Sequence, residues 1–377
     1  MFGDATVFSS KEFKLSILKG WLFEIVIRQM LLQNGFSQVP LDNRKSIHAR
    51  AVLSRDNFIE LKGRGGWHQI DCPCDLNYCS PFMFPIRLLG EVKFTKKKVD
   101  KAVVRQYIGV LRDIQENYFV ANPKIVLDNK PKRVLEIGCI FSANGFDAQA
   151  ENLAYAHGIK TISYENNVTI ERIKQSIEKL VEENVDLKDI DKVGKYLKDI
   201  INQFFQNGER FVFRDFINFS TMGGLVYCDV GEIFTGDYIQ SLSDLLNDIT
   251  TIRGNFIATT PEGLLLHFVG EKEFPYNLFN DSDHAQYRLH IEKSNRNGGG
   301  DAFFLSFVRG NGEYGKFYFS PPDVLKKAIK ENWKQVLDVK QRFLYKLVVH
   351  KDIKGMHRTL ILDLDNNWVW QKQKELR

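Results

Sequence analysis

Hydrophobic spacing predicts a helix at the start of the chain. Apolar residues recur three and four positions apart, as on one face of a helix, at Leu18, Leu22, Ile25 and Leu32. Gly35 follows them, and glycine commonly ends helices, so the sequence predicts a helix over residues 11–34. The next segment, residues 49–66, is mixed in character and ends in a glycine-rich turn.

Strand and helix patterns alternate after this turn. Two apolar runs with a proline-containing loop between them predict strands over residues 67–76 and 84–94, and an amphipathic pattern predicts a helix over residues 98–118. Three more elements complete the series: a strand at 132–143, a helix at 144–158 and a strand at 159–166. Strands that alternate with helices favour an α/β sheet with a parallel part. The pattern therefore predicts a first domain over residues 1–166.

The chain changes character at residue 167. Residues 167–207 are rich in charge and predict one or two helices, which would act as a connector or a dimerisation arm. Residues 208–377 contain many short strand-like runs, the first at 210–217, and a helix near 322–342. Glycine-rich turns typical of hairpins stand at 296–301 and 309–315. The sequence predicts a mainly β C-terminal domain that also contains helix.

Composition adds limits on class and location. The chain has 377 residues, enough for two or three domains, with 44% hydrophobic and 26% charged residues. No apolar run approaches the roughly 18 to 20 residues of a membrane span, and the N-terminus lacks the order of a secretory signal. We therefore expect a cytoplasmic protein with no membrane partner. Five cysteines are too few, and odd in number, for a disulfide framework.

Candidate chemistry lies at the ends of the two predicted strands. Glu91 and Lys93 form a Glu-x-Lys triplet, and the two-residue period of a strand places both side chains on one face. Asp71 ends the preceding apolar run, 20 positions before Glu91. A phosphodiesterase holds Mg²⁺ with carboxylates and needs a positive group near the attacking water. The three residues are suited to this task, although they could also be a turn cap and an exposed ion pair.

Four segments in this order resemble a known nuclease core: residues 63–71, 90–94, 103–114 and 141–165. Together they resemble the PD-(D/E)XK nuclease superfamily, most closely its Mrr-like restriction endonuclease branch, and the resemblance covers about residues 15–166. It implies an α/β restriction-endonuclease-like domain, in which a mixed sheet is flanked by helices. One position departs from the pattern, because Ile70 stands where the superfamily usually has a proline.

The resemblance also implies roles for individual residues. Asp71, Glu91 and Glu24 would bind Mg²⁺, with Mn²⁺ as a substitute, and Lys93 would assist the water. Gln106, on the helix after the triplet, would support the catalytic site. A structural alternative for Glu24 is an ion pair with Arg28, four residues further along the same helix.

Net charge points to a polyanionic partner near the triplet. The chain carries a net charge of +5; residues 1–167 hold 23 basic against 17 acidic residues, and the remainder holds 29 against 30. We expect DNA contacts from the basic cluster that follows the triplet and from residues around the glycine-rich turn: Lys96, Lys97, Lys98, Lys101, Arg105, Arg64, His68 and Gln69. A solvated face is the alternative for the lysines, and a structural hydrogen bond is the alternative for His68 and Gln69.

Two other features have competing interpretations. Cys72, Cys74 and Cys79 could bind zinc, but no clear fourth ligand is nearby, so buried cysteines are the default interpretation. The turn at Asn144 and Gly145 opens a predicted helix and could bind a phosphate, although such a turn is more often only a cap.

These observations favour a metal-dependent DNA endonuclease in restriction or anti-phage defence. A homodimer, or a higher homo-oligomer, would place one site on each DNA strand, with residues 168–207 as a candidate interface. One alternative is a repair or recombination nuclease acting on branched or single-stranded DNA, or an RNase. Another is a non-catalytic DNA-binding or effector-sensing module. By analogy, the C-terminal domain would serve recognition or regulation.

Overall fold

The structure is a computed structural model. It describes residues 10–184 and 252–375, apart from gaps at 47–48, 55–57, 80–82, 118–133, 253, 271, 280–283, 294–299, 311, 324, 327–342 and 354–355, together with residues 241, 244, 245 and 248. The chain divides into two compact units: Met1–Val26 with Arg172–Thr251, and Ile27–Glu171 with Ile252–Arg377. The domain boundaries expected at 166 and 207 stay predictions.

The predicted N-terminal helix is confirmed as α1, Ser10–Leu32. The chain leaves the helix at Gly35, whose φ of 79° lies in the left-handed region that favours glycine. A short strand, β1 (Phe36–Gln38), follows at once. The glycine thus ends the helix and turns the chain into the sheet.

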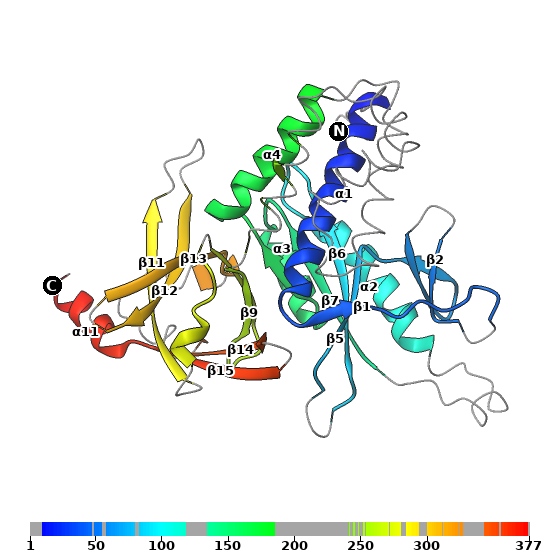
Figure 1. Cartoon of the computed structure of the whole chain (residues 1–377). Coiled ribbons are helices and arrows are strands. Elements are labelled where there is room, and N and C mark those ends of the chain that lie inside the picture. The colour runs from blue at the N-terminus through cyan, green and yellow to red at the C-terminus, as the bar shows by residue number, and fades with distance from the viewer. Residues whose placement is uncertain are drawn as a thin grey trace, which may run out of the picture. The chain divides into compact units, whose positions relative to one another are not determined.

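Five strands form a mixed sheet in the order β1-β5-β6-β7-β8. The members after β1 are β5 (Cys72–Leu76), β6 (Ile86–Lys93), β7 (Leu135–Ser142) and β8 (Lys160–Ser163). β5 runs antiparallel to β1 and β6, whereas β6, β7 and β8 are mutually parallel. The mixed α/β class, with a partly parallel sheet, is therefore confirmed (Figure 1).

The strand predicted over residues 67–76 was wrong, because it is two strands in different sheets. β4 (Trp67–Gln69) joins β2 (Ala51–Leu53) and β3 (Ile59–Lys62) in a small antiparallel sheet, and β5 belongs to the main sheet. The chain bends at Asp71, between β4 and β5. Ile70 and Cys72, on either side of the bend, are both buried. The hydrophobic pattern therefore runs through the bend, and it cannot show where one strand ends and the next begins.

Two helices pack on one face of the main sheet (Figure 1). These are α2 (Lys101–Glu116) and α3 (Ala148–Ala156). The buried residues of α2 recur at helical spacing: Val104, Tyr107, Leu111 and Ile114. They share an apolar core with Leu89 of β6 and Ile140 of β7. Asp100 caps α2 by accepting hydrogen bonds from the N–H groups of the second and third helical residues.

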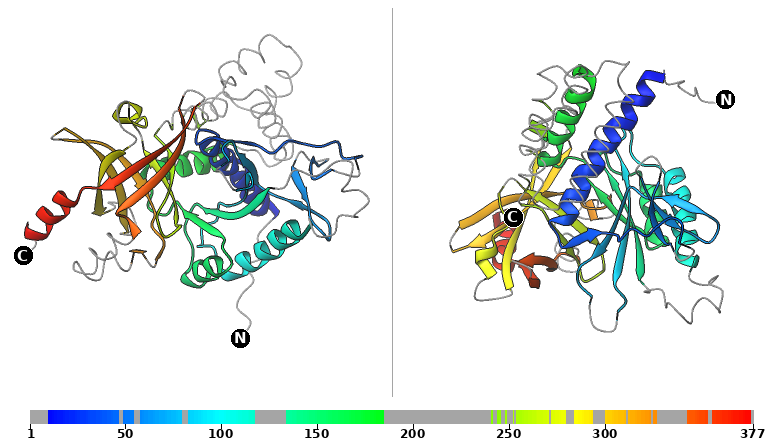
Figure 2. Two further views of the ribbon diagram at one scale, coloured as in Figure 1. Left: turned by 90° about the horizontal axis from the view of Figure 1, so that it is seen from below. Right: turned by 45° about the vertical axis from the view of Figure 1, so that its right-hand side comes forward.

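Seven strands of the C-terminal region close into a barrel in the order β10-β13-β12-β11-β15-β14-β9. They are β9 (Phe256–Thr259), β10 (Leu265–Gly270), β11 (His284–Lys293), β12 (Asp301–Arg309), β13 (Gly312–Phe319), β14 (Lys346–Ile353) and β15 (Met356–Leu364). Figure 2 shows these strands in yellow-green to red. The core of the barrel contains many phenylalanine side chains, and the ring of Phe256 contacts those of Phe268 and Phe317. The mainly β prediction is confirmed for this region.

Three helical elements complete the described chain: α4 (Val168–Asn184), η4 (Tyr276–Phe279) and α11 (Asn366–Glu375). α4 confirms the helical start of the predicted connector. Several predictions lie outside the described residues: the connector beyond 184, the strand at 210–217, most of the turn at 296–301, most of the helix near 322–342, and Cys228. No helix among the described residues is long and apolar enough to cross a membrane.

Candidate active site

Asp71, Glu91 and Lys93 lie together at one end of the β5–β6 pair. Cys72 pairs with Gly90 in the antiparallel register, so Asp71 and Glu91 follow at the same end of the two strands. Val92 is buried, while Glu91 and Lys93 are only partly buried, as the two-residue period predicts. The structure thus brings together three of the residues selected from the sequence.

The carboxylate of Asp71 is fixed by the triplet itself. Its Oδ2 accepts a hydrogen bond from the backbone N–H of Val92 at 2.8 Å. Arg28 of α1 donates from Nε at 2.7 Å, and also from Nη2, to the backbone carbonyl of Asp71. The guanidinium group therefore holds the main chain at the bend and leaves the carboxylate for other contacts.

Lys93 and Glu91 form an ion pair on the same face of β6. Nζ of Lys93 contacts Oε1 of Glu91, and their side chains are 28% and 21% exposed. The carbonyl of Lys93 accepts a hydrogen bond from the N–H of Ala143 at 2.9 Å, which extends the contact between β6 and β7. The ammonium group is therefore held at the edge of the site, within reach of solvent.

Burial and charge both act on Asp71. Burial raises the pKa of its carboxyl group to about 6, and the neighbouring Glu91 charge adds to this increase. Lys93, the Val92 amide and Arg28 lower the pKa in part. Two carboxylates held this close repel each other, and a cation between them would relieve the repulsion.

The oxygen atoms present fit a hard divalent cation. Oδ1 of Asp71 and Oε2 of Glu91 accept no hydrogen bond from any residue that the structure describes. Carboxylate oxygens are the donors that Mg²⁺ and Mn²⁺ prefer. Within the described residues, no group of three or more His, Cys, Asp or Glu side chains surrounds a single point. The site therefore offers two protein ligands, which is common for Mg²⁺ because it retains several waters.

The structure does not assign Glu24 and Gln106, the two other predicted catalytic residues, to this site. Glu24 lies on the part of α1 that belongs to the first compact unit, whereas Asp71 belongs to the second, so its role as a metal ligand stays a prediction. Gln106 is exposed on α2, and its supporting role also stays a prediction.

Two predicted DNA contacts near the glycine-rich turn are paired with acidic residues of α2. His68 Nε2 lies 2.7 Å from Asp113 Oδ2, and Arg64 Nη1 lies 3.0 Å from Glu116 Oε2. The hydrogen bond from His68 lowers the pKa of the Asp113 carboxyl group. The structural hydrogen bond considered for His68 is thus present. Gln69 is exposed beside it.

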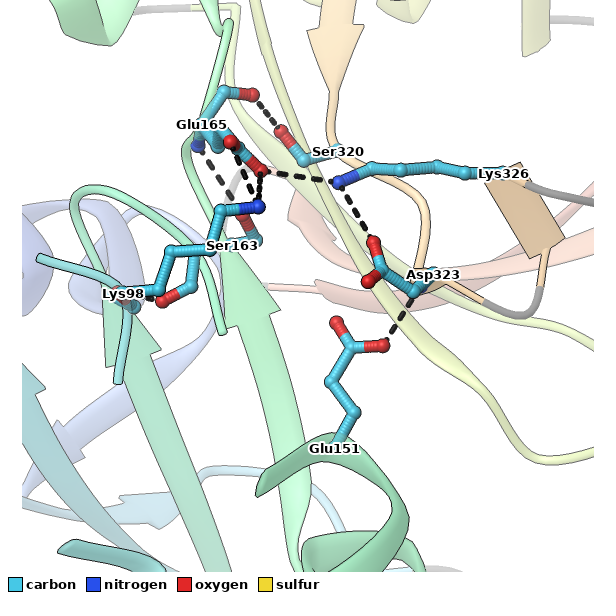
Figure 3. Close-up of polar contacts among 9 residues, drawn as sticks. Lys98, Glu151, Ser163, Glu165, Ser320, Asp323 and Lys326 are labelled. Carbon is cyan, nitrogen blue, oxygen red and sulfur yellow. Dashed lines mark hydrogen bonds and ion pairs between the residues drawn. The ribbon is translucent and has the colours of Figure 1, made fainter. Parts of the chain in front are cut away.

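In the basic cluster after the triplet, one residue is paired with an acidic side chain and the others are not. Lys98 pairs with Glu165, with Nζ 3.0 Å from Oε1, and Figure 3 shows this contact beside Lys326 of the C-terminal region. Lys96, Lys97, Lys101 and Arg105 are exposed, and within the described residues none of them forms an ion pair.

The competing interpretations of the cysteines and of the Asn144 turn can now be compared with the structure. Cys72 and Cys74 are buried, as the default interpretation expects, whereas Cys79 is exposed. Burial raises the pKa of the Cys74 thiol to about 12. At Gly145, whose φ is 80°, Oε2 of Glu165 lies 2.9 Å from where a Cβ would stand, so a phosphate there would meet a negative charge.

Sequence reasoning missed two supporting residues. Arg28 was considered only as a partner for Glu24, and its contact with Asp71 joins residues 43 positions apart. The hydroxyl of Tyr107 donates to the carbonyl of Leu89 and accepts from the N–H of Cys139 at 3.3 Å, so it ties α2 to β6 and β7. Only its helical spacing among apolar residues could have suggested that Tyr107 faces the sheet.

Comparisons with known proteins assign no family. No family model and no curated protein matches the chain. A solved structure titled "Crystal Structure of Protein of Unknown Function AF1548" aligns with 48% of this chain and 98% of its own, with 13% sequence identity and a TM-score of 0.26. A TM-score this low supports no argument about fold or function. The function must therefore be argued from the site.

Proposed function

We propose that the protein is a metal-dependent nuclease that hydrolyses phosphodiester bonds, with DNA as its substrate. One observation carries the proposal: the Asp71 carboxylate is bonded to the amide of Val92, between Glu91 and Lys93. Two acidic groups and one ammonium group thereby meet at the end of a strand pair. This combination suits metal-assisted phosphodiester hydrolysis, because negative charge develops on the phosphate while a water molecule loses a proton.

The residues present have distinct tasks in this proposal. Asp71 and Glu91 would hold Mg²⁺, which when bound supplies positive charge to the phosphate and lowers the pKa of water. Lys93 adds a positive charge beside Glu91 and can donate a hydrogen bond to a phosphate oxygen. Arg28 is a positioning residue, because it holds the main chain of Asp71 and touches no reacting atom.

The order of elements supports a restriction-endonuclease-like core. The three site residues lie at one end of the antiparallel pair β5 and β6. The parallel strands β7 and β8 follow, with α2 and α3 as the helices that connect β6 to β7 and β7 to β8. This is the layout that the PD-(D/E)XK resemblance implies. A role in restriction or anti-phage defence, a cytoplasmic location and a homodimer belong to the same proposal. The first rests on the resemblance, the second on composition, and the third on the two strands of the DNA substrate.

A plasmid-nicking assay tests the proposed function. Supercoiled DNA is incubated with the full chain and Mg²⁺, Mn²⁺ or EDTA, and wild type is compared with Asp71→Ala and Lys93→Ala. We expect nicking with either metal, none in EDTA, and a loss of at least about a hundredfold in both variants. Single-stranded DNA and RNA in parallel reactions identify the alternative nuclease classes.

Lys316→Ala is the matched control. Lys316 forms a similar lysine–carboxylate pair with Glu292 in the barrel, at 2.7 Å, and among the described residues this is its one ion pair. The control should nick DNA like wild type. If no nucleic acid is cut with any metal, or if the Asp71 and Lys93 variants cut as fast as the control, the nuclease proposal fails and a non-catalytic binding module becomes the better account.

A further inference from the structure

Basic residues around the site fall into two groups. In the first group, each basic side chain already faces an acidic group: Arg64 with Glu116, His68 with Asp113, and Lys98 with Glu165. The second group consists of exposed residues that form no ion pair with any described residue: Lys96, Lys97, Lys101, Arg105 and Arg112. Only the second group has charge available for a partner.

Three members of the second group lie in a line along α2. At 3.6 residues per turn, Lys101, Arg105 and Arg112 fall within a sector of about 40° around the helix axis. We call these three residues, with Lys96 and Lys97 just before the helix, the α2 stripe. With a rise of about 1.5 Å per residue, the helical part of the stripe is about 16 Å long. Asp113, the partner of His68, lies about 120° away from Lys101 around the axis of the same helix.

Helix stability does not explain the stripe. Positive charges near a helix N-terminus are unfavourable, yet four lysines stand within four residues of Asp100, and the first turn has no acidic residue. Asp100 already accepts hydrogen bonds from Ala102 and Val103, so the helix end itself is capped and is not the site. The arrangement therefore places charge for something outside the described chain.

Gly109 gives an independent reason to expect close approach on this side. It lies in the interior of α2, beside the stripe, where glycine costs about 1 kcal/mol relative to alanine. A Cβ at this position would meet nothing within 4 Å, so the packing of the described chain does not require glycine here. A flat, side-chain-free patch beside cations lets a rod-like backbone approach the helix closely.

We infer that the α2 stripe binds the phosphate backbone of a nucleic acid duplex, and that Arg64, His68 and Lys98 do not. Phosphates along one strand succeed each other about every 3.4 Å of duplex axis, so the helical part of the stripe could face about five of them. The inference deepens the proposed function and rests on it only for the choice of nucleic acid as the polyanion. It also adds Arg112, which donates to Gln115 at 3.3 Å and is otherwise exposed.

Two double variants with equal loss of charge test the inference. Lys101→Gln with Arg105→Gln removes two charges from the stripe, and Arg64→Gln with Lys98→Gln removes two charges that already face acids. Binding of a labelled duplex of about 20 base pairs is measured by fluorescence anisotropy in EDTA, across NaCl from about 50 to 200 mM. Thermal denaturation of both variants checks that each remains folded, and Lys96→Gln with Lys97→Gln is a second stripe variant outside the helix.

We expect the stripe variants to bind about tenfold more weakly than wild type at the lowest salt, with the slope of log affinity against log salt smaller by about two. The Arg64 and Lys98 variant should stay within about twofold of wild type. Equal weakening of both doubles, wild-type binding by the stripe variants, or no duplex binding by wild type would each overturn the inference.

Because binding is measured without metal, the two proposals fail separately. Stripe-dependent binding without cleavage in Mg²⁺ would leave the inference standing and remove the nuclease proposal. Cleavage by a protein whose stripe variants bind like wild type would remove the inference alone.

Discussion

Two clusters of carboxylates and lysines lie at the main sheet, and they differ in how many of their carboxylate oxygens have a partner within the described chain. At the site, Asp71 and Glu91 each keep one oxygen that accepts no hydrogen bond from a described residue. At Glu165, both oxygens are occupied: Lys98 lies 3.0 Å from Oε1, and Lys326 lies 3.3 Å from Oε2 (Figure 3). Open oxygens suit a ligand that comes from outside, and occupied oxygens suit a structural contact.

The Glu165 cluster is part of a joint between the main sheet and the barrel. The hydroxyl of Ser320 donates to the backbone carbonyl of Glu165, and a β-bridge links Ser163 to Ser320. The carboxylate of Glu151 accepts from the N–H of Asp323 at 2.7 Å. The joint therefore includes polar contacts between β8 and α3 of the main sheet region and the segment after β13.

A second, buried part of the joint contains a lysine. Nζ of Lys351 donates to Oδ1 of Asn34 at 3.2 Å and to the carbonyl of Asn255 at 2.8 Å. His267 lies beside Asn255, and burial, together with the Lys351 charge, lowers the pKa of this histidine to about 3, so it is neutral. Because Oδ1 of Asn255 can only accept, Nε2 of His267 carries the proton, and Nδ1 accepts from the Tyr164 hydroxyl at 2.7 Å.

The largest stability effect is expected at Asn255. Asn255→Leu keeps the volume but leaves Asn34 and His267 buried with fewer partners, so unfolding should cost about 2–4 kcal/mol less. Urea denaturation measures this change. The exposed Asn77, replaced by leucine, is the control and should stay within about 0.5 kcal/mol of wild type. A loss of similar size in both variants would show that the joint has no special importance.

Lys351 predicts a pH dependence of stability. Burial lowers its pKa from 10.5 to about 7, so between these values the unfolded chain holds a proton that the folded chain lacks. The folded state is thus disfavoured progressively as the pH falls from about 10.5 to 7, and no further below 7. Lys351→Met removes this term, so its stability relative to wild type should improve from pH 10 to pH 7. Urea denaturation at about these two pH values checks the sign.

In that comparison only the difference between variant and wild type matters, because other groups titrate in the same range. A difference that is unchanged between the two pH values would mean that Lys351 keeps its proton in the folded chain. A positive charge that stays buried there would have to rely on the two neutral acceptors and the ring of Phe274, whose centroid lies 5.7 Å away.

The smallest effect is expected at Glu165. Its side chain is 26% exposed and that of Lys98 is 45% exposed, so their pairing is screened by water. Glu165→Gln should therefore change the free energy of unfolding by less than about 1 kcal/mol. Thermal denaturation at low and high salt measures the change, and a loss as large as that of Asn255→Leu would mean that the ionic part, and not the buried part, holds the joint.

The sequence predicted those elements whose hydrophobic pattern matches the burial of their side chains. α2 shows helical spacing from Val104 to Ile114, and β6 ends in a triplet whose alternation is preserved in the structure. The grouping of Asp71 with Glu91 and Lys93 was also predicted, because an antiparallel pair brings the ends of two such runs together.

What the sequence did not reveal depends on contacts between distant residues. The bend at Asp71 interrupts an apolar run, and it is held by hydrogen bonds from Val92 and Arg28, which are 21 and 43 positions away in the sequence. Lys351 stands in a strand on the face of Leu347 and Val349, where the period marks a core position but gives no reason for a lysine. Its acceptor Asn34 is 317 positions away, and no local pattern reports such a contact. β9, with four residues, and α11 were too short or too polar to be recognised.

The most direct test places the two clusters in one experiment. Glu91→Gln and Glu165→Gln each remove one negative charge from a lysine-paired carboxylate, and each variant is assayed for plasmid nicking in Mg²⁺ beside wild type. The account predicts that Glu91→Gln loses nicking by at least about a hundredfold, while Glu165→Gln retains it within a few fold. Nicking by Glu91→Gln at the wild-type rate would contradict the assignment of the Asp71, Glu91 and Lys93 cluster as the active site.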